Sequence, residues 1–330
     1  MIVDIAVIIP TFNAVNFISC ALESIANQTR QPKEVIIVDD NSSDLTIKTI
    51  EEVSQNLNLE VRVIALNKNH GAPAPGINIG IQNASAKYIC ILEQDDFFLP
   101  NKIEAALNIL EQNNSIILTG SLSATITPAV DALAEEVKVN TWNPKVTAHA
   151  VKYQDGFLVN NASQLLVEEG MFLSGFTALT FRKADYLSVL GLNNKYKIAA
   201  DFDFATRIVR HGSLFISSEV QYLRRIHGNN LSHNRIKSFF EDLEIRAQEE
   251  KSNPILKEKV LGFSYWLAEG AYLYNFISSF RLQILIATRP SCMLKNLIKG
   301  LVKIFLIKIG LREARFCGYT KAPYLHKHKK

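Results

Sequence analysis

Three acidic side chains follow a short apolar run in the N-terminal half of the chain. The run Tyr88–Leu92 breaks into Glu93, Asp95 and Asp96, and apolar residues then return before Pro100. Such a run is typical of a buried strand, and carboxylates gathered at its end repel one another unless water or a cation compensates them. Hard divalent ions prefer oxygen ligands. The pattern indicates either a Mg²⁺ or Mn²⁺ site for a diphosphate ligand or a solvated acidic turn before a helix.

A second acidic pair stands at the end of another apolar run. Asp39 and Asp40 follow Glu34–Val38. Because the carboxyl ends of parallel strands meet at one edge of a sheet, we expect both acidic groups to face one crevice. This half of the chain contains neither GxGxxG nor GxxxxGK[ST], so a glycine-rich phosphate loop is not expected. A cation held by carboxylates is the remaining economical way to bind a diphosphate.

Asp201 lies in the sequence AADFDFATRIVRHG, in which Phe202, Ala205 and Ile208 recur at helical spacing. This spacing predicts a helix that begins at about Asp201. An Asp in the first turn of a helix is favoured by the helix dipole and can be a simple cap. The alternative is a general base, a carboxylate held at a helix start where it takes a proton from an acceptor hydroxyl.

A polar loop at 226–232 contains His227 and follows two adjacent arginines, Arg224 and Arg225. Basic side chains and a His near an acidic metal site suit contact with phosphate or a place among the metal ligands. An ordinary surface loop has the same composition. The local sequence leaves both interpretations open.

From Ile5 to Leu92, apolar runs alternate with amphipathic segments, which is the pattern of a parallel sheet covered by helices. Residues 121–160 lack a clear period and are expected to be mostly loop with short elements. Strands are expected at Ile5–Pro10, Glu34–Val38, Val61–Leu66, Tyr88–Leu92, Ile116–Gly120, Phe176–Arg182, Ser213–Ser218 and Tyr222–Arg225. Helices are expected at Val15–Gln28, Leu45–Leu57, Pro75–Ala84, Ile103–Gln112, Ala162–Glu169 and Ala184–Leu190.

The C-terminal part is predicted to be helical, with helices at Lys237–Glu250 and Pro254–Phe280. The segment Pro290–Arg312 alternates Lys with aliphatic residues, and Lys295, Lys299 and Lys303 share one helical face. A basic amphipathic helix of this kind favours the surface of an anionic membrane. The alternative is a helix packed on the rest of the protein with its lysines extended into water.

Composition limits the remaining possibilities. The 330 residues are 48% hydrophobic and 21% charged, with a net charge of +4. A large core is therefore expected, and nucleic acid is not an expected partner. The four cysteines form no CxxC pair, which fits a reducing compartment. Neither a signal peptide nor an apolar run long enough to span a membrane is expected.

Three segments together resemble the start of a family 2 glycosyltransferase. They are VIIPTFN at Val7–Asn13, VIIVDDNSSD at Val35–Asp44 and LEQDDFFLP at Leu92–Pro100. The resemblance covers roughly the first 235 residues in order. It implies an α/β fold of the GT-A type, with a Rossmann-like, mostly parallel sheet flanked by helices. It also implies a catalytic domain at 1–235 and a helical C-terminal extension at 236–330.

The resemblance assigns a role to each residue that matches the family's motifs. The resemblance implies that Asp201 is the catalytic base and that Asp95, Glu93 and His227 bind the cation, Mn²⁺ or Mg²⁺. Ser174 and Gly175 fall on the acceptor side. Nucleotide contacts are implied for Pro10, Thr11, Phe12, Asn13, Asp40, Asn78 and Asp95, with Asp40 reading the donor base.

Three positions depart from the family pattern. Glu93 replaces the first Asp of an Asp-x-Asp motif and is one methylene longer. Ala200 stands where a Glu usually precedes the base. In the segment Pro75–Asn78 an Arg that usually precedes the Asn is missing.

The function implied by the resemblance is inverting transfer of a sugar from a nucleotide-sugar donor, linked to UDP, GDP or dTDP, onto a saccharide or lipid-linked acceptor. The expected setting is synthesis of a cell-surface polysaccharide or glycolipid at the cytoplasmic face of the plasma membrane. Two rivals remain. One is another metal-dependent nucleotide-using transferase, and the other is a non-catalytic nucleotide-sugar-binding module with the same fold.

Overall fold

The computed structural model describes residues 1–126, 138–139, 144–173, 175–228 and 230–252. The chain forms two compact units. Residues 1–166 and 171–230 make up the first, and residues 167–170 and 231–330 make up the second. The domain boundary expected at residue 235 stays a prediction.

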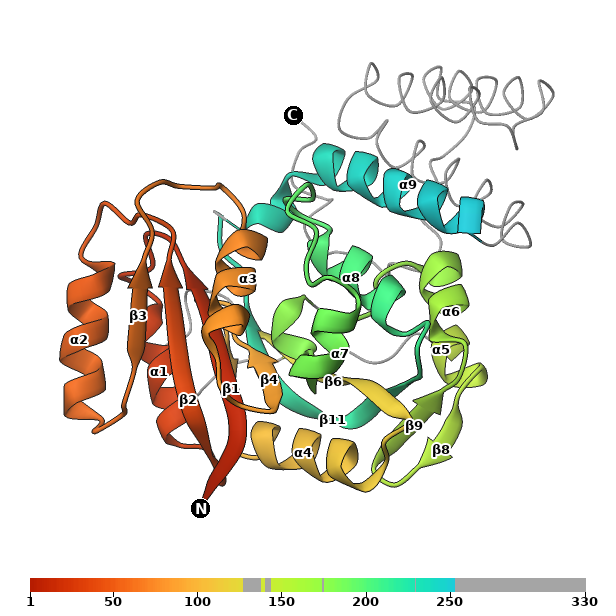
Figure 1. The fold of residues 1–330 in the computed structure, drawn as a ribbon, viewed down its shortest axis with the longest axis horizontal. Coiled ribbons are helices and arrows are strands. Elements are labelled where there is room, and N and C mark those ends of the chain that lie inside the picture. Colours follow the sequence, from red (N-terminus) through yellow and green to blue (C-terminus); the bar gives the residue numbers. More distant parts are fainter. Residues whose placement is uncertain (127–137, 140–143, 174, 229, 253–330) are drawn as a thin grey trace. The chain divides into compact units, whose positions relative to one another are not determined.

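The first unit is built on one sheet of eleven strands, in the order β3-β2-β1-β4-β10-β6-β11-β9-β8, with β5 paired to β11 and β7 paired to β6 (Figure 1). The two longest pairings, β1 with β2 and β6 with β11, are parallel, while β10 is antiparallel to both of its neighbours. The strands are β1 (Ile2–Thr11), β2 (Gln31–Asp39), β3 (Arg62–Ala65), β4 (Tyr88–Ile91), β5 (Phe97–Phe98), β6 (Ile116–Ile126), β7 (Lys138–Val139), β8 (Val151–Tyr153), β9 (Gly156–Val159), β10 (Thr180–Arg182) and β11 (Ser213–Arg225).

Helices cover both faces of the sheet, which confirms the expected α/β architecture. Helix α3 packs on β1 and β2, and α4 packs on β6, β10 and β11. Figure 1 shows α4 on the opposite side of β6 and β11 from α7 and α8. The helices are α1 (Ile18–Ala26), α2 (Thr46–Asn56), α3 (Pro73–Asn83), α4 (Lys102–Gln112), α5 (Pro144–Ala148), α6 (Ala162–Glu169), α7 (Lys183–Ser188), α8 (Ala200–Ile208) and α9 (Arg235–Ser252), with 3₁₀ helices η1 (Phe176–Ala178) and η2 (Leu231–His233).

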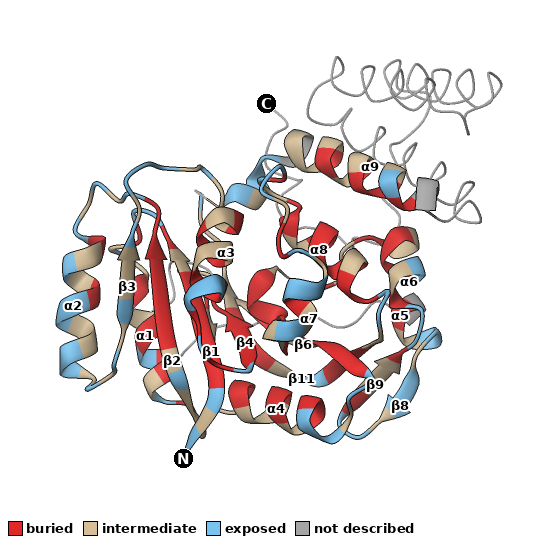
Figure 2. Cartoon of the chain, in the orientation of Figure 1, coloured by how far each residue is buried: buried red, intermediate tan, exposed pale blue. Residues whose placement is uncertain are grey.

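The apolar runs of the sequence form the centre of the sheet. Residues 5–9 of β1, 35–38 of β2 and 89–92 at the end of β4 are buried, and Figure 2 shows these strands buried along most of their length. A strand covered by helices on both faces needs apolar side chains on both faces, which is why the runs are continuous and not alternating. The polar residues begin where the runs stop, at one edge of the sheet.

Three details of the expected secondary structure are wrong. The segment Phe176–Arg182 is not one strand, because Gly175 has φ +81° and the chain turns through η1 before β10 begins. The two strands expected between 213 and 225 are one strand, β11, whose register with β6 shifts at irregular points. The strand expected at Ile116–Gly120 continues to Ile126 as β6, whereas the β8–β9 hairpin is one of the short elements expected at 121–160.

In the second unit, α9 confirms the helix expected at Lys237–Glu250. The helices expected at Pro254–Phe280 and Pro290–Arg312 lie outside the described residues. Within the described part of the chain, no helix is both long and apolar enough to cross a bilayer.

Candidate active site

The loop after β1 is tied to the loop after β2. Thr11 donates its hydroxyl to Asp39 at 2.9 Å, and Ser42 donates to the same carboxylate through its backbone N–H and its hydroxyl. Asn13 has φ +47°, and its amide oxygen accepts the backbone N–H of Ser43 at 2.9 Å. Asp39 therefore holds the two loops in place. The segment from Pro10 to Asn13, which is predicted to bind the nucleotide, is therefore held in a fixed position.

Asp40, the residue expected to read the donor base, is only 7% exposed. Its carboxylate accepts the backbone N–H of His70 at 2.8 Å and that of Gly71 at 3.2 Å, and it lies 2.6 Å from Nδ1 of the His70 ring. These contacts fix the carboxylate against the turn that precedes α3. Its contact with a nucleotide base stays a prediction.

Gln94 joins the nucleotide loop to the acidic turn after β4. Its amide oxygen accepts the backbone N–H of Phe12 at 2.7 Å, and its amide nitrogen donates to the carbonyl of Phe12 at 3.2 Å. Gln94 stands between Glu93 and Asp95 in the sequence. The loop expected to bind the nucleotide and the turn expected to bind the cation are therefore held together by a two-point contact.

The acidic turn brings several carboxylates close enough to repel one another. Burial and the charges of Asp95 and Asp201 raise the pKa of Glu93 to about 7, although Arg224 opposes the shift. Burial, Glu93 and Asp95 likewise raise the pKa of Asp96 well above its usual range. Asp201 therefore lies near enough to the acidic turn for its charge to act on Glu93, and its role as the base stays a prediction. The cluster carries excess negative charge that a bound cation would neutralise.

Asp96 is a buried anchor below the acidic turn. Its carboxylate accepts the hydroxyl of Thr177 at 2.8 Å and the backbone N–H of Arg225 at 3.0 Å. The Thr177 hydroxyl also accepts the backbone N–H of Glu93 at 3.1 Å. These bonds join the turn after β4 to η1 and to the end of β11.

Asp95 carries the contacts that matter most for a metal. One of its oxygens lies 2.9 Å from Nε2 of His227 and accepts the amide N–H of Asn230, also at 2.9 Å. The His227 ring stacks on Phe17 with a centroid distance of 4.6 Å. A carboxylate oxygen beside an imidazole nitrogen is a donor set that suits Mn²⁺. The described residues contain no group of three or more His, Cys, Asp or Glu that could hold a metal ion. The metal-ligand roles expected for Asp95, Glu93 and His227 stay predictions.

The acceptor-side residues have different outcomes. Ser174 lies outside the described residues. Gly175 packs directly against Glu93, because a Cβ built on Gly175 would lie 2.5 Å from Oε2 of Glu93. With its φ of +81°, this position favours Gly both for its backbone and for its contact with the carboxylate.

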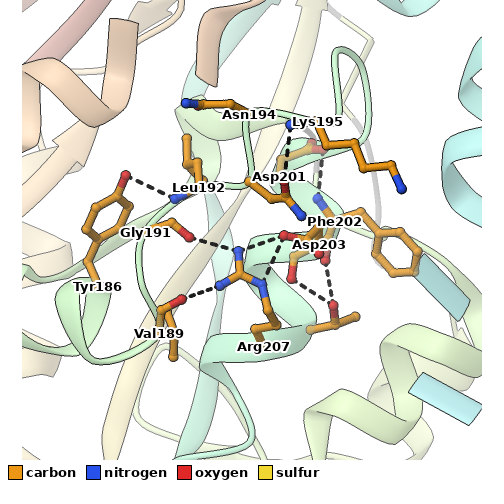
Figure 3. A network of polar contacts seen from close by, with 12 residues as sticks. Tyr186, Val189, Gly191, Leu192, Asn194, Lys195, Asp201, Phe202, Asp203 and Arg207 are labelled. Carbon is orange, nitrogen blue, oxygen red and sulfur yellow. Dashed lines mark hydrogen bonds and ion pairs between the residues drawn. The ribbon is translucent and has the colours of Figure 1, made fainter. Parts of the chain in front are cut away.

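Asp201 occupies the first turn of α8, as the helical spacing predicts. Its carboxylate oxygen Oδ1 accepts the backbone N–H of Phe202 at 2.8 Å. Two residues further on, Asp203 forms an ion pair with Arg207 at 2.6 Å. Figure 3 shows Arg207 reaching from α8 to the carbonyls of Val189 and Gly191. This pair holds the loop that leads into Asp201.

Asn78 fastens the same loop from the other side. Its amide oxygen accepts the hydroxyl of Tyr186 and the backbone N–H of Leu192, the latter at 3.0 Å. Its amide nitrogen donates to the carbonyl of Leu192 at 3.0 Å and to the side chain of Asn194 at 2.8 Å. An amide has two lone pairs and two N–H groups, and all four are in use. The nucleotide contact expected for Asn78 stays a prediction.

Replacing Asn78 by Ala is expected to lower the free energy of unfolding by about 3 kcal/mol. The change leaves the hydroxyl of Tyr186, which is 2% exposed, and the carbonyl of Leu192 without their Asn78 partner, and each such group costs about 1–3 kcal/mol. Urea unfolding measures the loss. Asn83→Ala is the matched control, because Asn83 lies on the same helix and its bonds are exposed. Equal losses in the two variants would contradict the clamping role of Asn78.

The raised pKa of Glu93 makes the stability of the folded protein depend on pH. The folded state binds the Glu93 proton more tightly than the unfolded state, in which the pKa is near 4.5. The free energy of unfolding therefore falls as pH rises from about 4.5 to about 7. Urea unfolding in cation-free buffer is expected to show Glu93→Gln reducing this fall by about 1–3 kcal/mol. Part of the fall remains, because Asp96 shifts in the same direction. An exposed control, Glu60→Gln, is expected to keep the slope of the unchanged protein, and an unchanged slope in Glu93→Gln would refute this assignment.

Several residues of the site carry no local signal in the sequence. Gln94, Thr177 and Asn230 are ordinary polar residues until the fold places them beside the acidic turn. Arg224 was expected as a surface or phosphate-binding residue, and it also acts on Glu93 and Asp96 as a half-buried counter-charge. The repeated Arg at the end of a strand was the available signal for it.

Comparison with solved structures supports the fold. S. aureus TarS 1-349, solved in complex with UDP-GlcNAc, is 17% identical with a TM-score of 0.60, and the match covers 94% of this chain and 93% of that one. The mannosyltransferase PcManGT of Pyrobaculum calidifontis, solved with GDP-Man and Mn²⁺, is 15% identical with a TM-score of 0.57, covering 92% and 80%. At these identities the likeness concerns the fold, which is the GT-A type that the motifs imply.

Sequence comparison gives the family. An uncharacterized glycosyltransferase of Rickettsia felis is 38% identical over 112 residues, which is 34% of this chain. The match spans only 18% of the length of that relative. The model of glycosyl transferase family 2 matches residues 6–183, a stretch that includes the loop after β1, Asp40 and the whole acidic turn. The chain therefore belongs to glycosyl transferase family 2.

Proposed function

We propose that the protein transfers a sugar, with inversion, from a nucleotide-sugar donor to a saccharide or lipid-linked acceptor. The observation that carries the proposal is the electrostatic contact of Glu93 with Asp95 and Asp201, at the sheet edge where the nucleotide loop is tied to the acidic turn through Gln94. A site for the donor, a site for a cation and a base are then neighbours. The catalytic domain is proposed to span 1–235 and the helical region 236–330.

The chain's own residues divide the work as follows. Asp95 and His227 hold the divalent cation, Mn²⁺ or Mg²⁺, with Glu93 as a further carboxylate beside them. When bound, the cation offsets the negative charge that develops on the departing nucleoside diphosphate. The solved PcManGT complex with GDP-Man and Mn²⁺ supports this choice of ion. Asp201 accepts the proton of the acceptor hydroxyl as that hydroxyl attacks the anomeric carbon.

The donor class is a UDP-, GDP- or dTDP-linked sugar. TarS is solved with UDP-GlcNAc and PcManGT with GDP-Man, so the same fold accepts more than one nucleotide. The acceptor is proposed to belong to a cell-surface polysaccharide or glycolipid. Nucleotide contacts are assigned to the segment from Pro10 to Asn13 and to Asp40, whose positions the surrounding hydrogen bonds fix.

The place of action is proposed to be the cytoplasmic face of the plasma membrane. The support is the sequence alone, in which lysines recur through Pro290–Arg312, outside the described residues. Deleting residues 290–330 is expected to release the protein from anionic vesicles in a sedimentation assay, because a basic amphipathic helix binds through both its apolar face and its charge. Unchanged binding of the truncated protein would refute the membrane role of this segment, and neutral vesicles are the control.

A non-catalytic nucleotide-sugar-binding module is the second candidate. Two departures from the family motifs favour it: Glu93 stands in place of an Asp, and Ala200 precedes the base. It is also favoured because no three His, Cys, Asp or Glu among the described residues are grouped so that they could hold a metal ion. Such a module would bind the donor and never turn it over. Loss of the sugar from the nucleotide over time, followed with and without added acceptors, separates it from an enzyme.

Calorimetry with UDP-, GDP- and dTDP-sugars, each titrated with and without Mn²⁺, tests the proposal. Tighter binding of one nucleotide in the presence of Mn²⁺ is the expected result, and it names the donor class. Binding that ignores Mn²⁺ would contradict the cation site. No binding of any of these nucleotides would contradict the donor site itself.

A further inference from the structure

A groove of about 500 Å³ lies between α4 and β11, with the turn of the β8–β9 hairpin at one end. On α4 it is lined by a single stripe at helical spacing, and on β11 by alternate residues, which point to one face of the strand. The α4 stripe runs from Asn101 to Gln112 and the β11 row from Phe215 to Gln221. Two facing elements in a core would present apolar side chains, but nine of the twelve lining residues here are polar.

The polar side chains are arranged in fixed pairs across the groove. Asn101 donates its amide N–H to Glu219 at 3.3 Å, and Gln154 donates to Gln112 at 2.7 Å. Each pair joins α4 to a different neighbour and leaves the remaining amide and carboxylate atoms of its members without partners among the described residues. Fixed side chains with spare donors and acceptors are what a polar ligand site requires.

Gln221 adds a further hydrogen-bonding group to the groove. It is 4% exposed and lines the groove. Its amide nitrogen donates to Ser217 at 3.1 Å, whereas its amide oxygen has no partner among the described residues. Because this side chain lines the groove, its amide oxygen is available to a hydrogen-bond donor of a ligand. The side chains of Asn108 and Asp155, further along the groove, also have no partners in the described part of the chain.

The chemistry of the lining selects the class of ligand. Five of the twelve residues are Asn or Gln, and none is Lys, Arg or His, so phosphates and nucleotides would meet only acidic charge and are excluded. Glu104 is already neutralised by Arg30 at 3.4 Å and accepts a bond from Thr29. No metal cluster occurs among the described residues. What remains is an uncharged ligand rich in hydroxyl groups, each able to donate and accept.

We propose that this groove binds a saccharide chain, at a site separate from the candidate active site. Amide and carboxylate groups pair with hydroxyls, while Ala105, Ile109 and Phe215 supply the small apolar part of the lining. The inference rests on the proposed function, because its ligand is the distal part of the acceptor or product. The end at Asn101 adjoins the turn that carries Asp95 through residues 96–100. A second contact of this kind raises the effective concentration of a long acceptor.

The test compares two pairs of substitutions in the full chain. Asn108→Ala with Asp155→Ala removes two groove side chains that form no hydrogen bonds within the described part of the chain, so folding is expected to be unchanged. Asn56→Ala with Glu60→Ala, on and after α2, makes the same kind of change on an exposed surface away from the groove. The probes are the tetramers of glucose and of N-acetylglucosamine, followed by calorimetry, with spermine as a cationic probe.

Binding of a tetramer to the unchanged protein and to the α2 pair, weakened about tenfold or more in the groove pair, is the expected result. Equal binding in all three proteins, no binding of either tetramer, or binding of spermine alone would each overturn the proposal. Nucleotide titration with Mn²⁺ in the same samples distinguishes failure of the groove proposal from failure of the proposed function. If nucleotide binds and no saccharide does, the groove proposal alone fails, and if no nucleotide binds, the proposed function fails.

Discussion

Replacing Asp201 by Asn is expected to lower sugar transfer by about 10²–10⁴-fold, the usual contribution of a general base, while the donor nucleotide binds as before. Asn keeps the shape of Asp and still offers an oxygen to the backbone N–H of Phe202, the bond that Asp201 makes at the start of α8. The loop before it remains held by Asn78 and by Arg207. The variant therefore removes the base and leaves its surroundings in place.

Two measurements are needed for this variant. Transfer is followed by release of the nucleoside diphosphate, and donor binding by calorimetry. Asp4→Asn is the control, because Asp4 is an exposed residue paired only with Lys33 at the start of β1. Full transfer activity in Asp201→Asn would rule out Asp201 as the base. Loss of donor binding together with activity would show that Asp201 serves the donor site.

Asp95→Asn is expected to have the complementary effect, with the apparent affinity for Mn²⁺ weakened by about 10–100-fold and transfer lowered with it. A ligating carboxylate contributes its charge to a hard cation, and Asn lacks that charge. Its amide still offers an oxygen to Asn230, which bonds Asp95 at 2.9 Å. The neighbouring loop is therefore expected to keep its conformation.

Titration of Mn²⁺ against a fixed concentration of nucleotide measures this effect. Asp185→Asn, in α7, is the control for a change of charge outside the acidic turn. A variant with unchanged Mn²⁺ dependence would exclude Asp95 as a ligand. The two variants together separate the base from the cation site, since Asp201→Asn keeps nucleotide binding and Asp95→Asn loses the part that depends on the metal.

The centre of the fold can be predicted from local sequence because its elements are specified locally. The apolar runs Ile5–Pro10 and Glu34–Val38 give β1 and β2, since a strand buried on both faces tolerates few polar residues. The segment Phe176–Arg182 has strand-like composition as well. There the backbone conformation of Gly175 and its packing against Glu93 decide the outcome, and a contact with a residue 82 positions away leaves no trace in the local pattern.

The candidate site likewise contains residues that local sequence identifies and residues whose contacts only the fold determines. Glu93, Asp95 and Asp201 are visible in the sequence because acidic residues directly after a buried strand, or in the first turn of a helix, are conspicuous. The family resemblance implies a nucleotide contact for Asn78, and the structure adds that its amide bonds to Leu192 and Asn194, more than 100 positions further on. No local pattern in the sequence predicts long-range hydrogen bonds of this kind.

The two hydrogen bonds between Gln94 and Phe12 have a thermodynamic consequence. They couple two segments so that these move together: the loop that is proposed to bind the nucleotide and the turn that is proposed to bind the cation. If two ligands each restrict the motion of these coupled segments, the first to bind has already lost their conformational entropy. The second ligand then loses less entropy on binding. Linkage then requires reciprocity: whatever factor the cation adds to nucleotide affinity, the nucleotide adds to cation affinity.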